Sequence, residues 1–141
     1  MFIRKRGKTK FMWLPVTIST TFSEGGIVSW DSGYLIEATS TTNAYYHAGV
    51  IRHAITAADA DYAVARLVEV EVPVEHNVEW ETLVTATLVV ADRGLYVDLT
   101  DNLHLNRGAS TYDVAQITKF ISTTKCYCIL NLGGEGGGAV A

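Results

Sequence analysis

The most constraining feature of this sequence is a seven-residue alternation, Val68-Glu-Val-Glu-Val-Pro-Val74. Its four valines fall at every second position, with Glu69 and Glu71 between them. Because successive side chains of a β-strand point to opposite faces, this period of two predicts a half-buried strand with valines toward a core and glutamates toward solvent. Pro73 has no N–H to donate to a ladder, so we expect an edge strand or a strand near its end.

Short β-rich segments and turn residues continue along the rest of the chain. Residues 27–30 and 34–39 flank Asp31-Ser-Gly33, a turn with the chemistry that hairpins require. Residues 114–121 fit a strand or a short helix, and a strand is favoured because another β-rich run follows directly. Neither βαβ spacing nor a convincing internal repeat is evident. Residues 11–18 are expected to be a strand or an anchored segment, and further strands are expected at 49–56, 80–90, 95–100, 103–105 and 126–132.

The chain is long enough for one domain with a substantial core. It has 141 residues, of which 48% are hydrophobic. We expect a compact all-β fold, either a small barrel or a sandwich, over residues 11–132. A basic N-terminal arm (1–10) is expected to be extended or disordered until it finds a surface. The Gly-rich tail (133–141) is expected to be flexible.

The apolar run at 11–18 does not have the pattern of a signal peptide. It is short, contains Pro15 and lacks a small-x-small cleavage site. No stretch approaches the length of a membrane span. We therefore expect a protein made in the cytoplasm, with no membrane partner.

Charge is distributed unevenly. Five of the eleven basic residues lie in the first ten positions, which hold no acid. The remaining six face fifteen acids, which gives the rest of the chain a net charge of −9. An acidic body disfavours specific nucleic-acid binding, because phosphate contacts need clustered Lys and Arg. A basic arm can instead lie on an acidic protein surface.

No catalytic pattern stands out. Cys126 and Cys128 would point to the same face of a strand, where we expect buried free thiols rather than a strained disulfide. A Cys–His pair stays open on sequence grounds, although the apolar context favours inert thiols. No Gly-x-Ser-x-Gly elbow or phosphate loop is present, and we expect no enzyme activity, catalytic residue, cofactor or metal. The histidines lie in separate segments without metal-ligand spacing: His47, His53, His76 and His104.

Two acidic groups have alternative interpretations. Asp98, Asp101 and Asn102 suit turn capping better than a calcium loop, because their oxygen density is low. The second group is either a solvated, edge-protecting face or a docking surface for a basic partner. It comprises Glu69, Glu71, Glu75, Glu79 and Glu81.

The aromatic residues beside the arm are candidate anchors. Phe11 and Trp13 follow the basic segment directly, a setting common in protein interfaces, although closing the end of a barrel is an equal alternative. Trp30, Tyr45 and Tyr46 are the candidates if the chain instead binds a carbohydrate or receptor. The predicted partner-binding set is Arg4, Lys5, Arg6, Lys8, Lys10, Phe11 and Trp13.

Two stretches carry a family resemblance. Gly49-Val-Ile51 leads through an Ala/Asp-rich segment to the valine strand that ends near Pro73. Later, Asp92-Arg-Gly-Leu-Tyr-Val-Asp-Leu-Thr-Asp101 leads to Ala109-Ser110 and then to Thr118-Lys-Phe-Ile-Ser122. Together they resemble, in patterning rather than in an invariant motif, the small head decoration (cement) proteins of tailed bacteriophages.

The resemblance implies a virion structural protein on the capsid surface. Such proteins are β-rich, bind the outside of an expanded head, often as trimers, and bridge major capsid protein subunits. In that setting the basic arm would order on binding, and many weak contacts would add up over a repeating shell. A tail-tube or connector subunit that assembles by strand augmentation is the second hypothesis. A carbohydrate- or receptor-binding module is the third.

Overall fold

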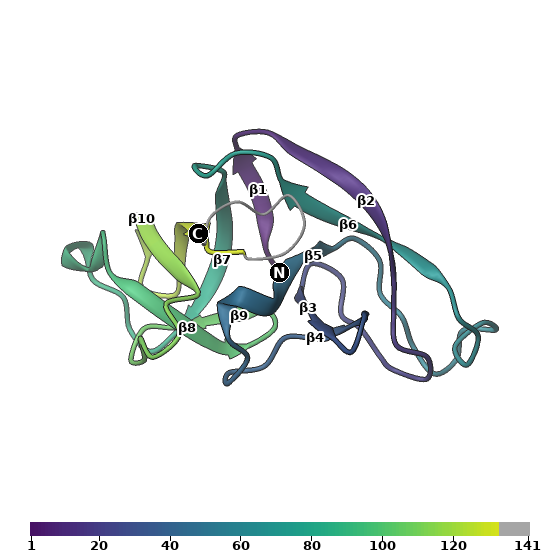
Figure 1. Ribbon diagram of the computed structural model, residues 1–141. Helices are drawn as coiled ribbons and strands as arrows, with labels where there is room; N and C mark the ends of the chain where they lie inside the picture. Colours follow the sequence, from purple (N-terminus) through teal and green to yellow (C-terminus); the bar gives the residue numbers. More distant parts are fainter. Residues whose placement is uncertain (133–141) are drawn as a thin grey trace.

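The protein is all-β, as the sequence predicts. The computed structural model describes residues 1–132, so the predicted Gly-rich tail lies outside the described residues. It contains a five-stranded mixed barrel beside a five-stranded antiparallel sheet (Figure 1). Between residues 1 and 132 the only helical pieces are two 3-10 turns, η1 (Ala44–Tyr46) and η2 (Val90–Asp92). None of the helical segments described is long and apolar enough to pass through a membrane.

The N-terminal sheet has the strand order β2-β6-β5-β3-β4, with every neighbouring pair antiparallel. The predicted hairpin between β3 and β4 is confirmed. Its turn residues Ser32 and Gly33 have φ values of 53° and 88°, the left-handed conformation of a tight hairpin turn. The strands are β2 (Thr9–Pro15), β3 (Ile27–Asp31), β4 (Tyr34–Glu37), β5 (His47–Ile51) and β6 (Leu67–Pro73).

The C-terminal barrel has the strand order β7-β11-β10-β8-β9 and is closed by a parallel pairing of β7 with β9. One additional strand, β1 (Ile3–Arg6), pairs antiparallel with β7. The region 114–121, open to two interpretations in the sequence, is a strand. The barrel strands are β7 (Glu79–Thr85), β8 (Tyr96–Asp101), β9 (His104–Asn106), β10 (Ala115–Ser122) and β11 (Lys125–Leu130).

The two units have the same connectivity, although the sequence shows no repeat. Numbered from first to fifth strand along the chain, each unit has the order 1-5-4-2-3. In the barrel the first and third strands pair in parallel. In the sheet the corresponding contact is a single parallel bridge between Val16, directly after β2, and Leu35 in β4. Connectivity depends on alternation and turns rather than on residue identity, so it can recur without a visible sequence repeat.

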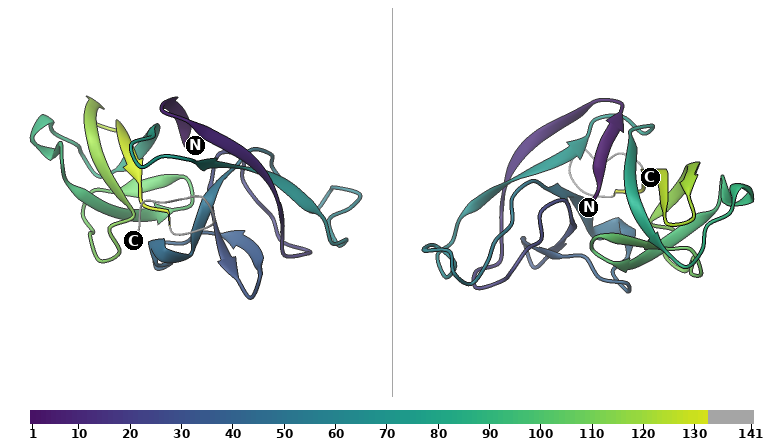
Figure 2. Two further views of the ribbon diagram at one scale, coloured as in Figure 1. Left: turned by 45° about the horizontal axis from the view of Figure 1, so that its top comes forward. Right: turned by 180° about the vertical axis from the view of Figure 1, so that it is seen from behind.

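A shared core joins the two units, which lie side by side in Figure 2. One hydrophobic cluster fills the barrel and also takes in Ile27 and Val50 from the sheet, whereas a second cluster lies within the sheet. Cys126 and Cys128 are buried free thiols in the first cluster, as predicted. Burial raises the pKa of Cys126 to about 12 and that of Cys128 well above its ordinary value.

The N-terminal arm is extended, which is one of its two predicted forms, but it pairs within the fold instead of waiting for a separate surface. Residues 3–6 form β1, and Thr9 and Lys10 already belong to β2. Phe2 is fully buried, and its N–H donates to the carbonyl oxygen of Gly25 at 2.8 Å. Figure 1 shows this first segment lying against β7, within the folded body.

Strand β6 shows the predicted burial on its valine face but not on its glutamate face. Val68, Val70 and Val72 are buried, but Val74 lies beyond the strand end and is exposed. Strand β6 is not an edge, because β2 and β5 pair with its two sides; Pro73 is its last residue. Glu71, expected toward solvent, is only 4% exposed, because side chains from other elements cover it.

Candidate attachment surface

Two of the predicted partner-binding cations contact acids of β7. Nζ of Lys5 lies 3.5 Å from Oε2 of Glu81, and the guanidinium of Arg6 pairs with the carboxylate of Glu79. The strand pairing places these residues near one another, because Ile3 lies opposite Glu81 in the register. The charges on both strands are therefore compensated within the chain.

The buried carboxylate of Glu71 holds the arm to the N-terminal sheet. Nε of Arg4 donates to its Oε2 at 2.9 Å, and Oγ1 of Thr9 donates to the same oxygen at 2.7 Å. Nη1 of Arg52 lies 3.5 Å from the other carboxylate oxygen. A carboxylate with this little solvent exposure requires such partners, because an unpaired buried charge is strongly unfavourable.

Three of the five glutamates in the second acidic group, Glu71, Glu79 and Glu81, are therefore paired with the protein's own basic N-terminus. The remaining members of this group also have partners: the backbone N–H of Lys8 donates to Glu75 at 2.8 Å, and His53 lies 3.5 Å from Glu69. A basic partner protein would have to displace these contacts. The signal in the sequence was the match between a run of cations at the N-terminus and alternating acids near residue 80.

Two aromatic side chains of the predicted set remain open to solvent. Phe11 is 53% exposed and Trp13 is 60% exposed, on the outer face of β2. Leu67 of β6, which lies opposite Pro15 in the register, is exposed on the same face. We call the outward side chains of Phe11, Trp13 and Leu67 the β2 surface. Figure 1 shows β2 as a long strand at the rim of the molecule.

The backbone at the β2 surface also lacks a neighbour on one side. The N–H of Val74 donates to the carbonyl of Lys8, and the N–H of Val16 donates to that of Arg66. Even-numbered residues of β2 therefore bond to β6, and the N–H and C=O groups of odd-numbered residues point away from it. Within the described part of the chain, no strand pairs with this outer edge from Thr9 to Trp13.

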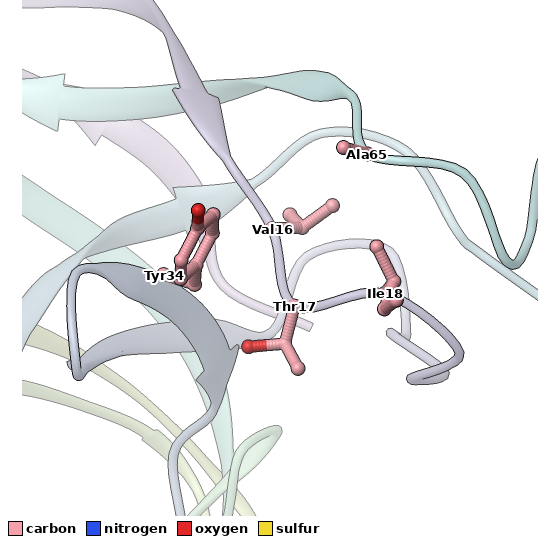
Figure 3. Close-up of a pocket in the computed structure, with 5 residues that line it drawn as sticks. All are labelled: Val16, Thr17, Ile18, Tyr34 and Ala65. Carbon is pink, nitrogen blue, oxygen red and sulfur yellow. The ribbon is translucent and has the colours of Figure 1, made fainter.

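An open, mostly apolar pocket of about 340 Å³ lies just beyond the end of β2. It sits where the parallel bridge at Val16 brings the strand end to β4. Figure 3 shows Tyr34 on one side of it and Ile18 on the other, with Ala65 from the segment before β6. The pocket extends the apolar character of this rim beyond the β2 surface.

The aromatic residues considered for carbohydrate binding are only partly brought together. Trp30 and Tyr46 line one open pocket of about 340 Å³ together with Ser29. The Trp30 side chain, however, packs against the core of the sheet. Tyr45 stacks edge-on against Tyr46, with ring centroids 5.4 Å apart, and both are exposed.

Two buried polar residues near this pocket carry no signal in the sequence. Ser29 and His47 are opposite one another on β3 and β5, and both are fully buried. The Ser29 hydroxyl and both ring nitrogens of His47 have no hydrogen-bond partner among the described residues. Burial lowers the pKa of His47 to about 4, so its ring is neutral at pH 7.

The acidic turn caps a loop, as predicted. Asp98 accepts backbone N–H groups from Thr111, Tyr112 and Asp113 at 2.7–2.9 Å. Asp101 accepts the N–H of Leu103 at 2.8 Å. Within residues 1–132, no three His, Cys, Asp or Glu side chains gather in a way that could hold a metal ion.

Comparison with known proteins adds no family assignment. No family model matches the chain, and no curated protein matches it in sequence.

Proposed function

We propose that this chain is a virion structural protein, a capsid decoration protein that binds the outer surface of a phage head and bridges major capsid protein subunits. The observation that carries the proposal is the β2 surface, where exposed aromatic side chains lie on a strand with a free edge. Exposed Trp and Phe side chains are typical anchors of protein interfaces. The sequence resemblance supplies the kind of assembly, and its proposed form in solution is a monomer or trimer.

The attachment mechanism differs from the one expected from sequence. Arg4, Lys5 and Arg6 each pair with a carboxylate of the chain, so a capsid that bound them would have to compete with these ion pairs. In the proposed mechanism, burial of Phe11 and Trp13 provides the attachment. Repetition over the shell lets weak single contacts hold each copy.

The test is co-sedimentation with expanded, undecorated heads of the virus that encodes the chain. Deleting residues 1–10 is a poor variant, because it removes β1 and part of β2. Phe11→Ser and Trp13→Ser are suitable, because both side chains are largely exposed, and Tyr45→Ser is a matched control on another surface. We expect the first two to release the protein from heads and the control to bind normally. Wild-type protein that stays in the supernatant would refute the proposal.

A tail-tube or connector subunit is the second candidate, favoured by the same free edge of β2. Light scattering of the isolated protein distinguishes the two. A monomer or trimer supports decoration, whereas large rings or tubes formed by the protein alone support the tail.

Binding of a carbohydrate is the third candidate, favoured by exposed Tyr46, which lines an open pocket together with Trp30. A glycan array probed with wild-type protein and with Tyr46→Ala tests it. Loss of a wild-type glycan signal in the variant would support this candidate.

A further inference from the structure

The repeated connectivity allows the two units to be compared strand by strand. Strand β2 opens the N-terminal sheet as β7 opens the C-terminal barrel. Each pairs on one side with the fifth strand of its unit, β6 or β11. The two strands can therefore be compared at their other edge, which differs between the units.

The outer edge of β7 is covered along its length. Strand β1 pairs antiparallel with its first half, Glu79–Glu81, and β9 pairs in parallel with its second half, Leu83–Thr85. Along the outer edge of β2, the only bridge among residues 1–132 is at the position equivalent to β9. It joins Val16, directly after β2, to Leu35 of β4. Among residues 1–132 nothing occupies the place on β2 that corresponds to β1.

The uncovered edge is suited to a further strand. The N–H and C=O groups of Thr9, Phe11 and Trp13 point away from β6, and the Phe11 and Trp13 side chains stand exposed beside them. Proteins usually protect such an edge with charges, prolines or bulges, because it can pair with another chain. Here Lys10 and Pro15 lie toward the two ends of the strand, the stretch from Phe11 to Trp13 holds neither a charge nor a proline, and the register between β2 and β6 has no bulge.

Charge indicates which kind of strand would fit. On β7 the covering strand is basic and the covered strand is acidic, with ion pairs Lys5–Glu81 and Arg6–Glu79. Near the free edge of β2 the charged residues are Lys10, on the strand, and Lys8, directly before it. No ion pair engages either amino group in the part of the chain that the structure describes.

We propose that the free edge of β2, from Thr9 to Trp13, takes an antiparallel strand from a partner protein. That strand is apolar where it passes Phe11 and Trp13, and acidic at its C-terminal end, which an antiparallel arrangement places beside Lys8 and Lys10. This inference rests on the proposed function, because it states how the β2 surface would bind its partner. Its test needs no phage head, so the strand-addition proposal and the proposed function can fail independently of each other.

The probe is a capped, fluorescein-labelled peptide, Ser-Val-Ile-Val-Thr-Val-Asp-Val-Glu, and its binding is measured by fluorescence anisotropy. The control peptide has the same residues in reverse order, which moves the acids to the other end. We expect the first peptide to bind more tightly than the second. The difference should shrink at high salt, because the preference depends on exposed charges.

A pair of variants separates backbone pairing from side-chain contact. Phe11→Ala removes the ring, whereas Phe11→Pro also removes an N–H that points to the free edge. Because that N–H is not used by β6, both variants should fold, which their melting curves would verify. We expect Phe11→Ala to weaken peptide binding several-fold and Phe11→Pro to weaken it by a further factor of about ten.

Each other outcome overturns part or all of the proposal. Absence of binding to either peptide refutes strand addition at this edge. Equal affinity for the two peptides refutes the assigned direction and charge. Equal affinities of the Ala and Pro variants refute backbone pairing. Sedimentation that shows a wild-type dimer and a monomeric Phe11→Pro variant would assign the edge to a second copy of this chain instead of a partner.

Discussion

Replacing Glu71 with Gln tests whether the N-terminal segment is locked into the fold. The carboxylate accepts hydrogen bonds from Arg4 and Thr9 at 2.9 and 2.7 Å, and Arg52 lies 3.5 Å away. Breaking a buried ion pair by removing one partner destabilises a protein by about 3–5 kcal/mol. The guanidinium side chains of Arg4 and Arg52 are 42% and 27% exposed, so water screens part of the loss and we expect about 2–3 kcal/mol.

Glu69→Gln is the matched control. Glu69 lies two residues earlier on the same face of β6, where it is more exposed and, among residues 1–132, pairs with His53 alone. Its substitution should change the free energy of unfolding by less than about 0.5 kcal/mol. Urea unfolding followed by circular dichroism measures both variants. The melting temperature of Glu71→Gln should fall by roughly 6–9 °C.

Equal stability of the two variants would refute the reasoning. It would mean that the contacts of Arg4 and Thr9 with Glu71 contribute nothing to stability, so that Glu71 does not hold the segment before β2 in the fold. In that case, the cations of the arm would again be available to a partner.

Three further predictions follow from buried groups. Asp98→Asn should lower the free energy of unfolding by about 2–4 kcal/mol in urea unfolding, because three backbone N–H groups lose a charged acceptor; a change below about 0.5 kcal/mol would contradict this. Because the pKa of His47 is about 4 when folded, the unfolded chain takes up its proton first. Stability is then complete above about pH 6.5 and falls by about 3 kcal/mol toward pH 4, and a His47→Gln variant with the same pH profile would contradict the assignment. Cys126 and Cys128 should resist a thiol reagent at pH 8 and react only on unfolding; rapid labelling of native protein would contradict their burial.

Local pattern determined most strands of this protein, with β1 as an exception. The alternation at residues 68–74 and the Asp31-Ser-Gly33 turn each specify a strand or hairpin from neighbouring residues alone, and the structure contains both. The face of Cys126 and Cys128 was equally predictable, because it depends only on the period of two. The period of two does not determine whether an outward-facing side chain is exposed to solvent.

Tertiary structure decided the environment of the charges. Glu69 and Glu71 are equivalent in the alternation, yet only Glu71 is buried, because β1 and Arg52 happen to cover it. The same packing turns a basic segment that looks free in the sequence into a strand paired with β7.

The candidate site, too, was predictable from the sequence only in part. Sequence pointed to Phe11 and Trp13, since exposed aromatics stand out beside a charged run. Sequence could not show that no described strand pairs with the adjoining edge of β2, or that the corresponding edge of β7 is covered. Both facts depend on strand pairings between residues far apart in the sequence, from 52 positions for Pro15 and Leu67 to 78 for Ile3 and Glu81, and such long-range contacts exist only once the chain has folded.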